Sequence, residues 1–332
     1  MSARLLVFFA ALLLLPGAAR AQEKGKTGDE VDVEQILSAV VGVRAKILPN
    51  ARSSATLGPQ REGSGVLVRD GYVATIGYLV IEAEAIEVTG ADGKSVPATL
   101  AGYDHTSGFG LLKLLAPLAG KPLPIGNSKS AAESGPALVA GYGADAVNVV
   151  QVVSRRPFSG SWEYMLDAAI FTAPAVMNWS GASLISAQGE LLGLGSLIVA
   201  DSAGNGTQSP GNMFVPADLL KSILDDLIAR GKPAGPVRPW MGVNAEEMRG
   251  RLFVTRVSPD GPADKAGLKS GDILIGVGKD EVSSLAEFYR KVWALGAAGV
   301  EVPLRVLQGV QVKEVTVRSI DRIEYFRARP SY

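Results

Sequence analysis

Residues 63–80 read GSGVLVRDGYVATIGYLV, and this stretch shows the pattern on which much of the chain is built. A short apolar run, VLV at 66–68, is followed by Asp and Gly, residues typical of turns. Similar runs recur further along, each set off by Gly, Asp, Asn or Pro, at 85–88, 109–114, 137–143 and 191–197. Many short strands separated by turn residues predict an all-β barrel or sandwich from Gly63 to about Val215.

The N-terminus has the features of a secretory signal. Arg4 is followed by an apolar run of 11 residues at 5–15 and by Ala-Arg-Ala at 19–21. We predict a signal peptide at 1–21 that is cleaved after Ala21, the alternative being an uncleaved anchor. The run is shorter than the roughly 20 residues that span a bilayer, so we expect no stable membrane insertion after cleavage.

Five further segments complete the expected organisation of the chain up to residue 238. Residues 22–32 are polar and predict a flexible leader, 33–48 predict a short helix followed by a strand, and 49–62 predict a loop. Leucine and isoleucine at helical spacing predict a helix over 217–230, with Gly231 as its C-cap. The Gly- and Pro-rich stretch at 233–238 predicts a linker.

After the linker, residues 239–326 alternate between strand and helix patterns. They predict a small mixed α/β domain with strands at 253–257, 272–278, 302–307 and 313–320 and helices at 263–268 and 284–295. The expected fold class is therefore mainly β, with one large β domain and one smaller domain.

Composition excludes several classes of function. The chain has 33 basic and 33 acidic residues, which argues against nucleic acid as the main partner because nucleic-acid binding needs a basic excess. It has no cysteine and one histidine, which excludes disulfides, a thiol nucleophile and most zinc sites, so we expect neither a metal nor another cofactor. A cysteine-free exported chain suggests a bacterial periplasm.

Four segments in order resemble the trypsin-like HtrA/Deg family of bacterial envelope proteases. They are 63–80, GYDHTSGFGLLKL at 102–114, LDAAI at 166–170 followed by NWSGASLISAQGELLGL at 178–194, and 212–232. The resemblance implies a trypsin-like double β-barrel over 33–232. It also implies a homo-oligomer, since members of this family are often trimers.

The catalytic triad of that family carries over unevenly. The histidine position falls on Tyr78, the aspartate position on Gly108, and the serine position on Ser180. A tyrosine is protonated at neutral pH and is a poor base, and glycine has no side chain to orient a partner. His105 lies three residues from Gly108, and a shifted site that uses Asp104 and His105 would need a large rearrangement. We expect His105 to be a solvated turn residue.

The resemblance places the oxyanion hole on Asn178, Trp179 and Ser180, but about five residues are inserted within 171–179, so the loop must differ. Asn can adopt the left-handed conformation that the family's glycine allows. Trp179 either covers the cleft or packs in the core. Ser180 is either a residual nucleophile or an ordinary serine in a glycine-rich turn.

The second domain resembles a PDZ domain, on RPWMGV at 238–243, SPDGPADKAGLKSGDILIGVG at 258–278 and SSLAEFYRKVWAL at 283–295. The resemblance implies that a peptide adds to the sheet edge and that backbone N–H groups of residues 241–243 bind its C-terminal carboxylate. The peptide-binding residues would be Trp240, Met241, Gly242, Val243, Phe288 and Val292. The alternative is that their side chains form the core of the domain.

Together these patterns predict an HtrA-like periplasmic pseudoprotease. It would bind unfolded or C-terminal peptide segments of envelope proteins as a scaffold, adaptor or quality-control factor, without cutting them. Two alternatives stay open: an active serine endopeptidase with an unorthodox site, and a purely structural interaction module.

Overall fold

The computed structural model describes residues 33–131, 135–143 and 147–326. The predicted signal peptide at 1–21 and the predicted leader at 22–32 lie outside the described residues. Within these ranges, no helix combines the length and apolarity needed to cross a membrane.

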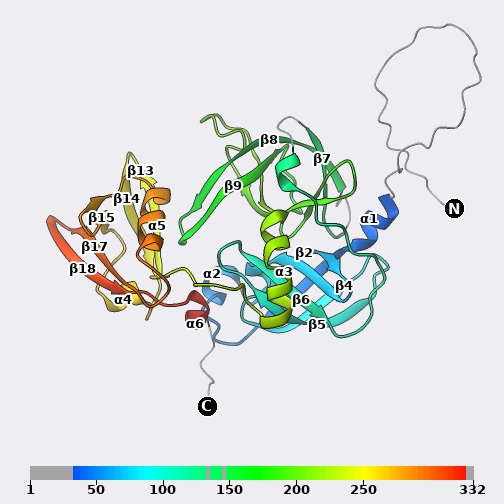
Figure 1. Cartoon of the computed structure of the whole chain (residues 1–332), viewed down its shortest axis with the longest axis horizontal. Coiled ribbons are helices and arrows are strands. Elements are labelled where there is room, and N and C mark those ends of the chain that lie inside the picture. Colours follow the sequence, from blue (N-terminus) through cyan, green and yellow to red (C-terminus); the bar gives the residue numbers. More distant parts are fainter. Residues whose placement is uncertain (1–32, 132–134, 144–146, 327–332) are drawn as a thin grey trace, which may run out of the picture. The chain divides into compact units, whose positions relative to one another are not determined.

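Six antiparallel strands close into a first barrel in the order β1-β2-β3-β6-β5-β4, coloured blue to cyan in Figure 1. Their bounds are β1 Val40–Ile47, β2 Gln60–Arg69, β3 Tyr72–Ile76, β4 Ala83–Thr89, β5 Ser95–Tyr103 and β6 Phe109–Leu114. Val66 on β2 pairs with Val40 on one side and Ala74 on the other, and all three side chains are buried. Closure pairs every strand edge and leaves an apolar interior.

A second barrel closes in the order β10-β11-β12-β9-β8-β7, coloured mainly green in Figure 1. Its strands are β7 Pro136–Ala140, β8 Val147–Gly160, β9 Tyr164–Ala173, β10 Ser183–Ile185, β11 Leu191–Val199 and β12 Gly211–Pro216. Val139, Leu184 and Phe214 are each fully buried at its centre. Strands β8 and β9 form a long hairpin, and the three residues between them, 161–163, are central to the site described below.

Short helices connect and flank the barrels: α1 Val33–Ala39, α2 Ser54–Leu57, and the 3-10 helices η1 Gly77–Leu79 and η2 Ser128–Ser130. The long helix α3, Ala217–Arg230, follows the second barrel. It buries Leu220, Leu224 and Leu227 on one face, and it ends at Gly231, whose φ of 73° and N–H bond to the Leu227 carbonyl form a left-handed cap.

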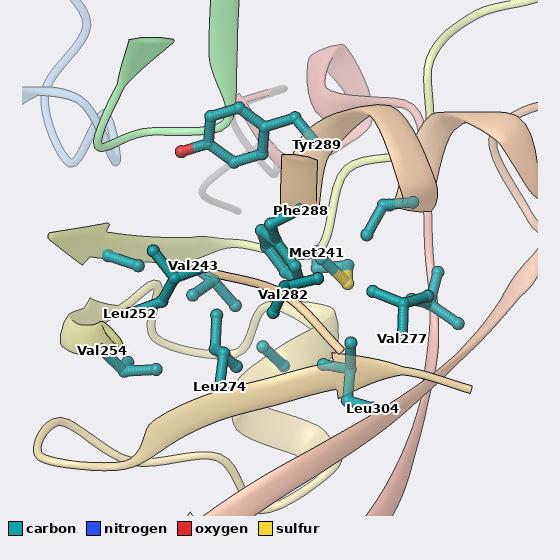
Figure 2. Close-up of a cluster of buried hydrophobic side chains, with 14 of the residues drawn as sticks. Met241, Val243, Leu252, Val254, Leu274, Val277, Val282, Phe288, Tyr289 and Leu304 are labelled. Carbon is teal, nitrogen blue, oxygen red and sulfur yellow. The ribbon is translucent and has the colours of Figure 1, made fainter. Parts of the chain in front are cut away.

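The C-terminal domain is a six-stranded sheet with two flanking helices. Its elements are β13 Val243–Met248, β14 Arg251–Val257, α4 Pro262–Lys265, β15 Ile273–Val277, β16 Asp280–Glu281, α5 Leu285–Ala294, β17 Glu301–Gln308 and β18 Gln311–Arg318, followed by α6 Arg322–Phe326. Ser284 caps α5 by accepting a bond from the Glu287 N–H. Figure 2 shows the apolar cluster between helix and sheet, with Phe288 and Met241 inside it.

The predicted fold class is confirmed: two β-barrels precede a small α/β domain. The helix predicted at 217–230 is confirmed residue for residue. The loop predicted at 49–62 is only partly right, because it contains α2 and the first residues of β2. Strand β8 was not predicted, because its sequence has no continuous apolar run: polar and exposed residues lie between its buried ones.

The stability of the protein should depend more on Leu184, inside the second barrel, than on an exposed leucine. We predict that Leu184→Ala, which removes a fully buried side chain, lowers the free energy of unfolding by about 2–5 kcal/mol. Leu115→Ala, at a residue that is 58% exposed, is the matched control and should change it by less than about 0.5 kcal/mol. Urea unfolding measures both, and equal effects would contradict this placement of the core.

Candidate functional site

The two barrels are linked by a hydrogen bond between the side chains of Tyr78 and Ser180. Tyr78 lies in η1 of the first barrel, and its hydroxyl oxygen is 2.9 Å from Ser180 Oγ. The same hydroxyl donates to the Ser196 carbonyl oxygen at 3.1 Å. Because a phenol has one hydroxyl hydrogen, donation to Ser196 leaves Ser180 to donate its own hydrogen to the phenol oxygen. Ser180 therefore faces a neutral phenol, at the position that the resemblance predicts for the family's histidine.

The protonation state of Tyr78 follows from its surroundings. Burial raises the pKa of the Tyr78 phenol above its ordinary value near 10, and this outweighs the lowering by the bond from Ser180. The phenol is therefore fully protonated at physiological pH. A neutral phenol oxygen accepts a hydrogen bond but does not take a proton from an alcohol.

The turn that carries Tyr78 is held by a buried arginine. Arg61 on β2 is 5% exposed, and its guanidinium donates to the carbonyl oxygens of Tyr78 at 2.7 Å and Ile81 at 3.1 Å. It also donates to Ser53 Oγ at 2.7 Å, and Ser53 in turn bonds the Glu82 carboxylate. These bonds fix the backbone on both sides of Tyr78, so the position of its ring is set by the fold.

Gly108, predicted above to occupy the position of the family's aspartate, lies next to this turn and supplies no carboxylate. Its carbonyl accepts the Gly77 N–H at 2.7 Å, directly before Tyr78. Its φ is +82°, a conformation that side chains other than glycine's adopt with strain. A Cβ at this position would lie 3.5 Å from the ring of Tyr164. The structure thus brings the three predicted triad positions together, and of the three only Ser180 has a residue type used in such a triad.

His105 does not replace the missing base. The prediction of a solvated histidine is wrong, because the ring packs edge-on against Tyr103 with 4.4 Å between centroids and lies over Phe326 at 6.3 Å. Both ring nitrogens are buried and have no hydrogen-bond partner among the described residues. Burial, with Arg322 nearby, holds the pKa of His105 well below its usual value.

Asp104, the other residue of the shifted arrangement, forms hydrogen bonds within its own turn. Its carboxylate accepts the N–H groups of Thr106 and Ser107 and the hydroxyl of Ser107, at 3.0, 2.9 and 2.6 Å. An Asp104–His105–Ser180 arrangement is therefore not formed in this structure.

The turn around Ser180 is packed tightly between the barrels. Gly181 has a φ of +73°, and a Cβ there would lie 1.9 Å from the Ser64 carbonyl oxygen. The Ser64 N–H donates to the Ser180 carbonyl at 2.8 Å, and the Gly181 N–H donates to the Gly195 carbonyl at 2.8 Å. Asn178 is exposed, whereas Trp179 is half-buried with its ring centroid 6.4 Å from that of Tyr78. Trp179 therefore lies beside the Tyr78 ring and is not fully buried in the core.

The second candidate site lies in the C-terminal domain. The side chains of Met241, Val243, Phe288 and Val292 are all buried in the domain core, as the alternative reading allowed. Trp240 is 6% exposed and packs against Tyr325 at 4.8 Å between centroids. The backbone N–H groups of residues 241–243 converge on one carboxylate, as the sequence predicts for a peptide C-terminus.

That carboxylate belongs to Glu163, at the tip of the β8–β9 hairpin. The Met241 N–H donates to Oε2 at 2.9 Å, and the N–H groups of Gly242 and Val243 donate to Oε1 at 2.6 and 2.8 Å. Sequence analysis did not identify Glu163, because nothing in GSWEY at 160–164 distinguishes it from an exposed turn glutamate. Among the described residues no group of three or more His, Asp or Glu side chains is placed to hold a metal ion.

Both domains resemble known protein families. Residues 63–194 match the trypsin-like peptidase domain family, and residues 239–318 match the PDZ domain family. A probable periplasmic serine protease do/HhoA-like of Haemophilus influenzae is 29% identical over 278 residues, which cover 77% of this chain and 57% of the relative. Protease Do-like 1, chloroplastic, of Arabidopsis thaliana is 28% identical over 283 residues, covering 78% and 63%.

Solved structures give the same fold. The HtrA-type protease AlgW with decapeptide aligns with a TM-score of 0.52 at 23% identity, over 87% of this chain and 97% of the other. The serine endoprotease from Yersinia pestis aligns with a TM-score of 0.50 at 24% identity, over 87% and 96%. The chain spans little more than half the length of most of the curated relatives it matches, between 52% and 63%.

The Tyr78–Ser180 pair makes a sharp prediction about reactivity. Because burial raises the Tyr78 pKa above 10, no phenolate forms to activate the serine between pH 6 and pH 10. We expect a fluorophosphonate probe to leave Ser180 unlabelled across this range, as measured by intact-protein mass spectrometry. Trypsin serves as the positive control and Ser180→Ala as the blank. Labelling of wild type that is lost in Ser180→Ala would show that the serine is activated.

Proposed function

We propose that this chain, an HtrA/Deg-like family protein with a trypsin-like peptidase domain and one PDZ domain, is a pseudoprotease that binds peptides without cutting them. The PDZ domain would receive unfolded segments or C-termini of exported proteins. The protein would then act as a scaffold, an adaptor or a quality-control factor in the cell envelope.

One observation carries the first half of this proposal: the group bonded to Ser180 Oγ is the neutral Tyr78 hydroxyl. Loss of one triad member lowers turnover by about 10⁴ to 10⁶. Here both the base and the carboxylate that would orient it are replaced. The oxyanion-hole amides and substrate binding would leave only a residual rate, about 10³ to 10⁴ times that in water.

Peptide binding is supported by the loop at residues 241–243, whose three N–H groups already hold a carboxylate. Three converging backbone donors are the chemistry that captures a peptide C-terminus. The neighbouring strand β13 and helix α5 flank the place where a peptide would lie. Export to a periplasm and assembly into a homo-oligomer are further parts of this proposal, based on the signal-like N-terminus and on the family.

A second candidate is an active endopeptidase, which the retained serine and the protease names of the relatives favour. We predict that wild type and Ser180→Ala degrade unfolded casein equally little, within the background of the assay, on denaturing gels over a day. Degradation by wild type that stops in Ser180→Ala would replace the pseudoprotease with an enzyme.

Peptide binding is tested separately, by fluorescence anisotropy on a labelled pool of decapeptides with an apolar last residue and a free C-terminus. The same pool with amidated C-termini is the control, because an amide cannot satisfy three N–H donors as a carboxylate does. We expect binding of the free pool only. Binding of neither pool by any variant would favour a structural interaction module.

A further inference from the structure

The tip of the β8–β9 hairpin occupies the groove of the PDZ domain. The Glu163 carboxylate is buried and accepts all three loop N–H groups at 2.6–2.9 Å. Two residues earlier, the Ser161 carbonyl accepts the Ala245 N–H on β13 at 2.9 Å. A carboxylate in the loop and a backbone bond to the adjacent strand are the two contacts that define peptide addition to a PDZ sheet.

Helix α5 holds the same turn from the other side. The Tyr289 hydroxyl donates to the Gly160 carbonyl at 2.6 Å and accepts the Glu163 N–H at 3.2 Å. Figure 2 shows the Tyr289 ring at the edge of the apolar cluster with its hydroxyl pointing away from Phe288 and Met241. The turn is therefore bonded to β13 and to α5, the two walls of the groove.

Apolar and ionic contacts extend this interface along β9. Met165 is 5% exposed and belongs to the core cluster of the PDZ domain, and it is the one described member of that cluster from outside the domain. Asp167 is 3.5 Å from Arg290 on α5, although both side chains are mostly exposed and the pair contributes little. The docked turn thus combines a carboxylate, a strand-like bond and a buried apolar side chain.

We propose that residues 160–165 are an internal ligand of the PDZ domain, with the Glu163 side chain in the place of a peptide C-terminal carboxylate. An external peptide binds only when it displaces this turn. The inference rests on the proposed peptide binding and names its regulation: the groove is closed by the chain's own barrel. The C-terminal carboxylate of a peptide and the Glu163 side chain that occupies the loop are the same chemical group.

The central test is Glu163→Ala in the full mature chain, with Glu314→Ala as the matched control. Glu314 is exposed on β18, so its loss removes the same charge without touching the groove. Each Kd for the free-carboxylate decapeptide pool is measured by anisotropy. We expect Glu163→Ala to bind at least about tenfold more tightly than wild type, because three hydrogen bonds to a charged group no longer compete. Glu314→Ala should match wild type.

Hydrogen exchange tests the closed groove without any peptide. The amides of Met241, Gly242 and Val243 should exchange at least about tenfold faster in Glu163→Ala than in wild type, since exchange follows loss of their acceptor. Adding the peptide pool to the variant should restore protection. If Glu163→Ala does not fold, Tyr289→Phe keeps the buried ring, removes the bond to Gly160, and should shift both measurements in the same direction.

The outcomes separate this inference from the proposed function. Equal peptide affinity and equal loop exchange in wild type and Glu163→Ala would overturn the internal ligand and leave peptide binding standing. Faster loop exchange with no peptide bound by any variant would support the internal ligand and overturn the proposed binding. Tighter binding by Glu163→Ala supports both.

The pH dependence offers an independent check. Burial raises the pKa of Glu163 from 4.5 to about 7 in the docked turn, although the loop N–H bonds and Arg322 lower it. Other charged or titratable groups around it are Tyr289 on α5 and, lining the same cavity, Tyr103, Asp104, His105, Tyr164, Lys232, Arg238 and Asp321.

The direction of the pH effect follows from the difference in the Glu163 pKa between the docked and the released turn. The docked turn binds a proton more tightly than the released turn, so docking strengthens as the pH falls through 7 and stops strengthening below about 4.5. Peptide binding by wild type should weaken about tenfold from pH 8 to pH 6, relative to Glu163→Ala. The same pH profile in both proteins would contradict burial of Glu163 in the loop.

Discussion

The hydrogen bond between Tyr78 and Ser180 joins the two barrels, at the positions predicted for the catalytic histidine and serine of the family. Around it, the Ser64 N–H binds the Ser180 carbonyl, and the Thr75 hydroxyl binds the Ser64 carbonyl at 2.7 Å. Gly63 and Gly181 allow this close approach, since a Cβ on either would lie within 3 Å of a backbone oxygen. The junction is thus satisfied by internal hydrogen bonds of neutral groups, and the group bonded to Ser180 Oγ is the Tyr78 hydroxyl.

Much of this architecture follows from local sequence. Helix α3 is specified by leucines at helical spacing and by Gly231, and most strands of both barrels are marked by short apolar runs between turn residues. Strand β8 could not be predicted in this way, because exposed residues interrupt its buried ones and no continuous apolar run results. Helix α2 escaped prediction for a similar reason: it is four residues long, and none of its side chains is buried.

For the candidate site, too, the sequence predicts some features, whereas others depend on the three-dimensional structure. The residue types at 78, 108 and 180 are visible in the sequence, so a site without histidine or aspartate at the first two positions is a prediction from sequence alone. The orientation of the Tyr78 hydroxyl toward Ser196, and the packing of His105 on Tyr103, depend on residues far apart in the chain. Glu163 is the clearest case, because its partners at 241–243 lie about 80 residues away and no local pattern links the two segments.

Tethering explains why an internal carboxylate competes effectively with external ones. Residues joined in one chain meet at effective concentrations that reach the millimolar range. The apparent affinity for an external peptide is therefore lowered by the fraction of molecules in which the turn is docked. The tethered turn also leads into β9, which continues through Ala173 toward the segment that carries Ser180. In an enzyme, that connection would couple groove occupancy to the geometry of the nucleophile. Under the proposed function, Ser180 bonds a neutral phenol, so displacement of the turn would change what the groove binds without changing the reactivity of the serine.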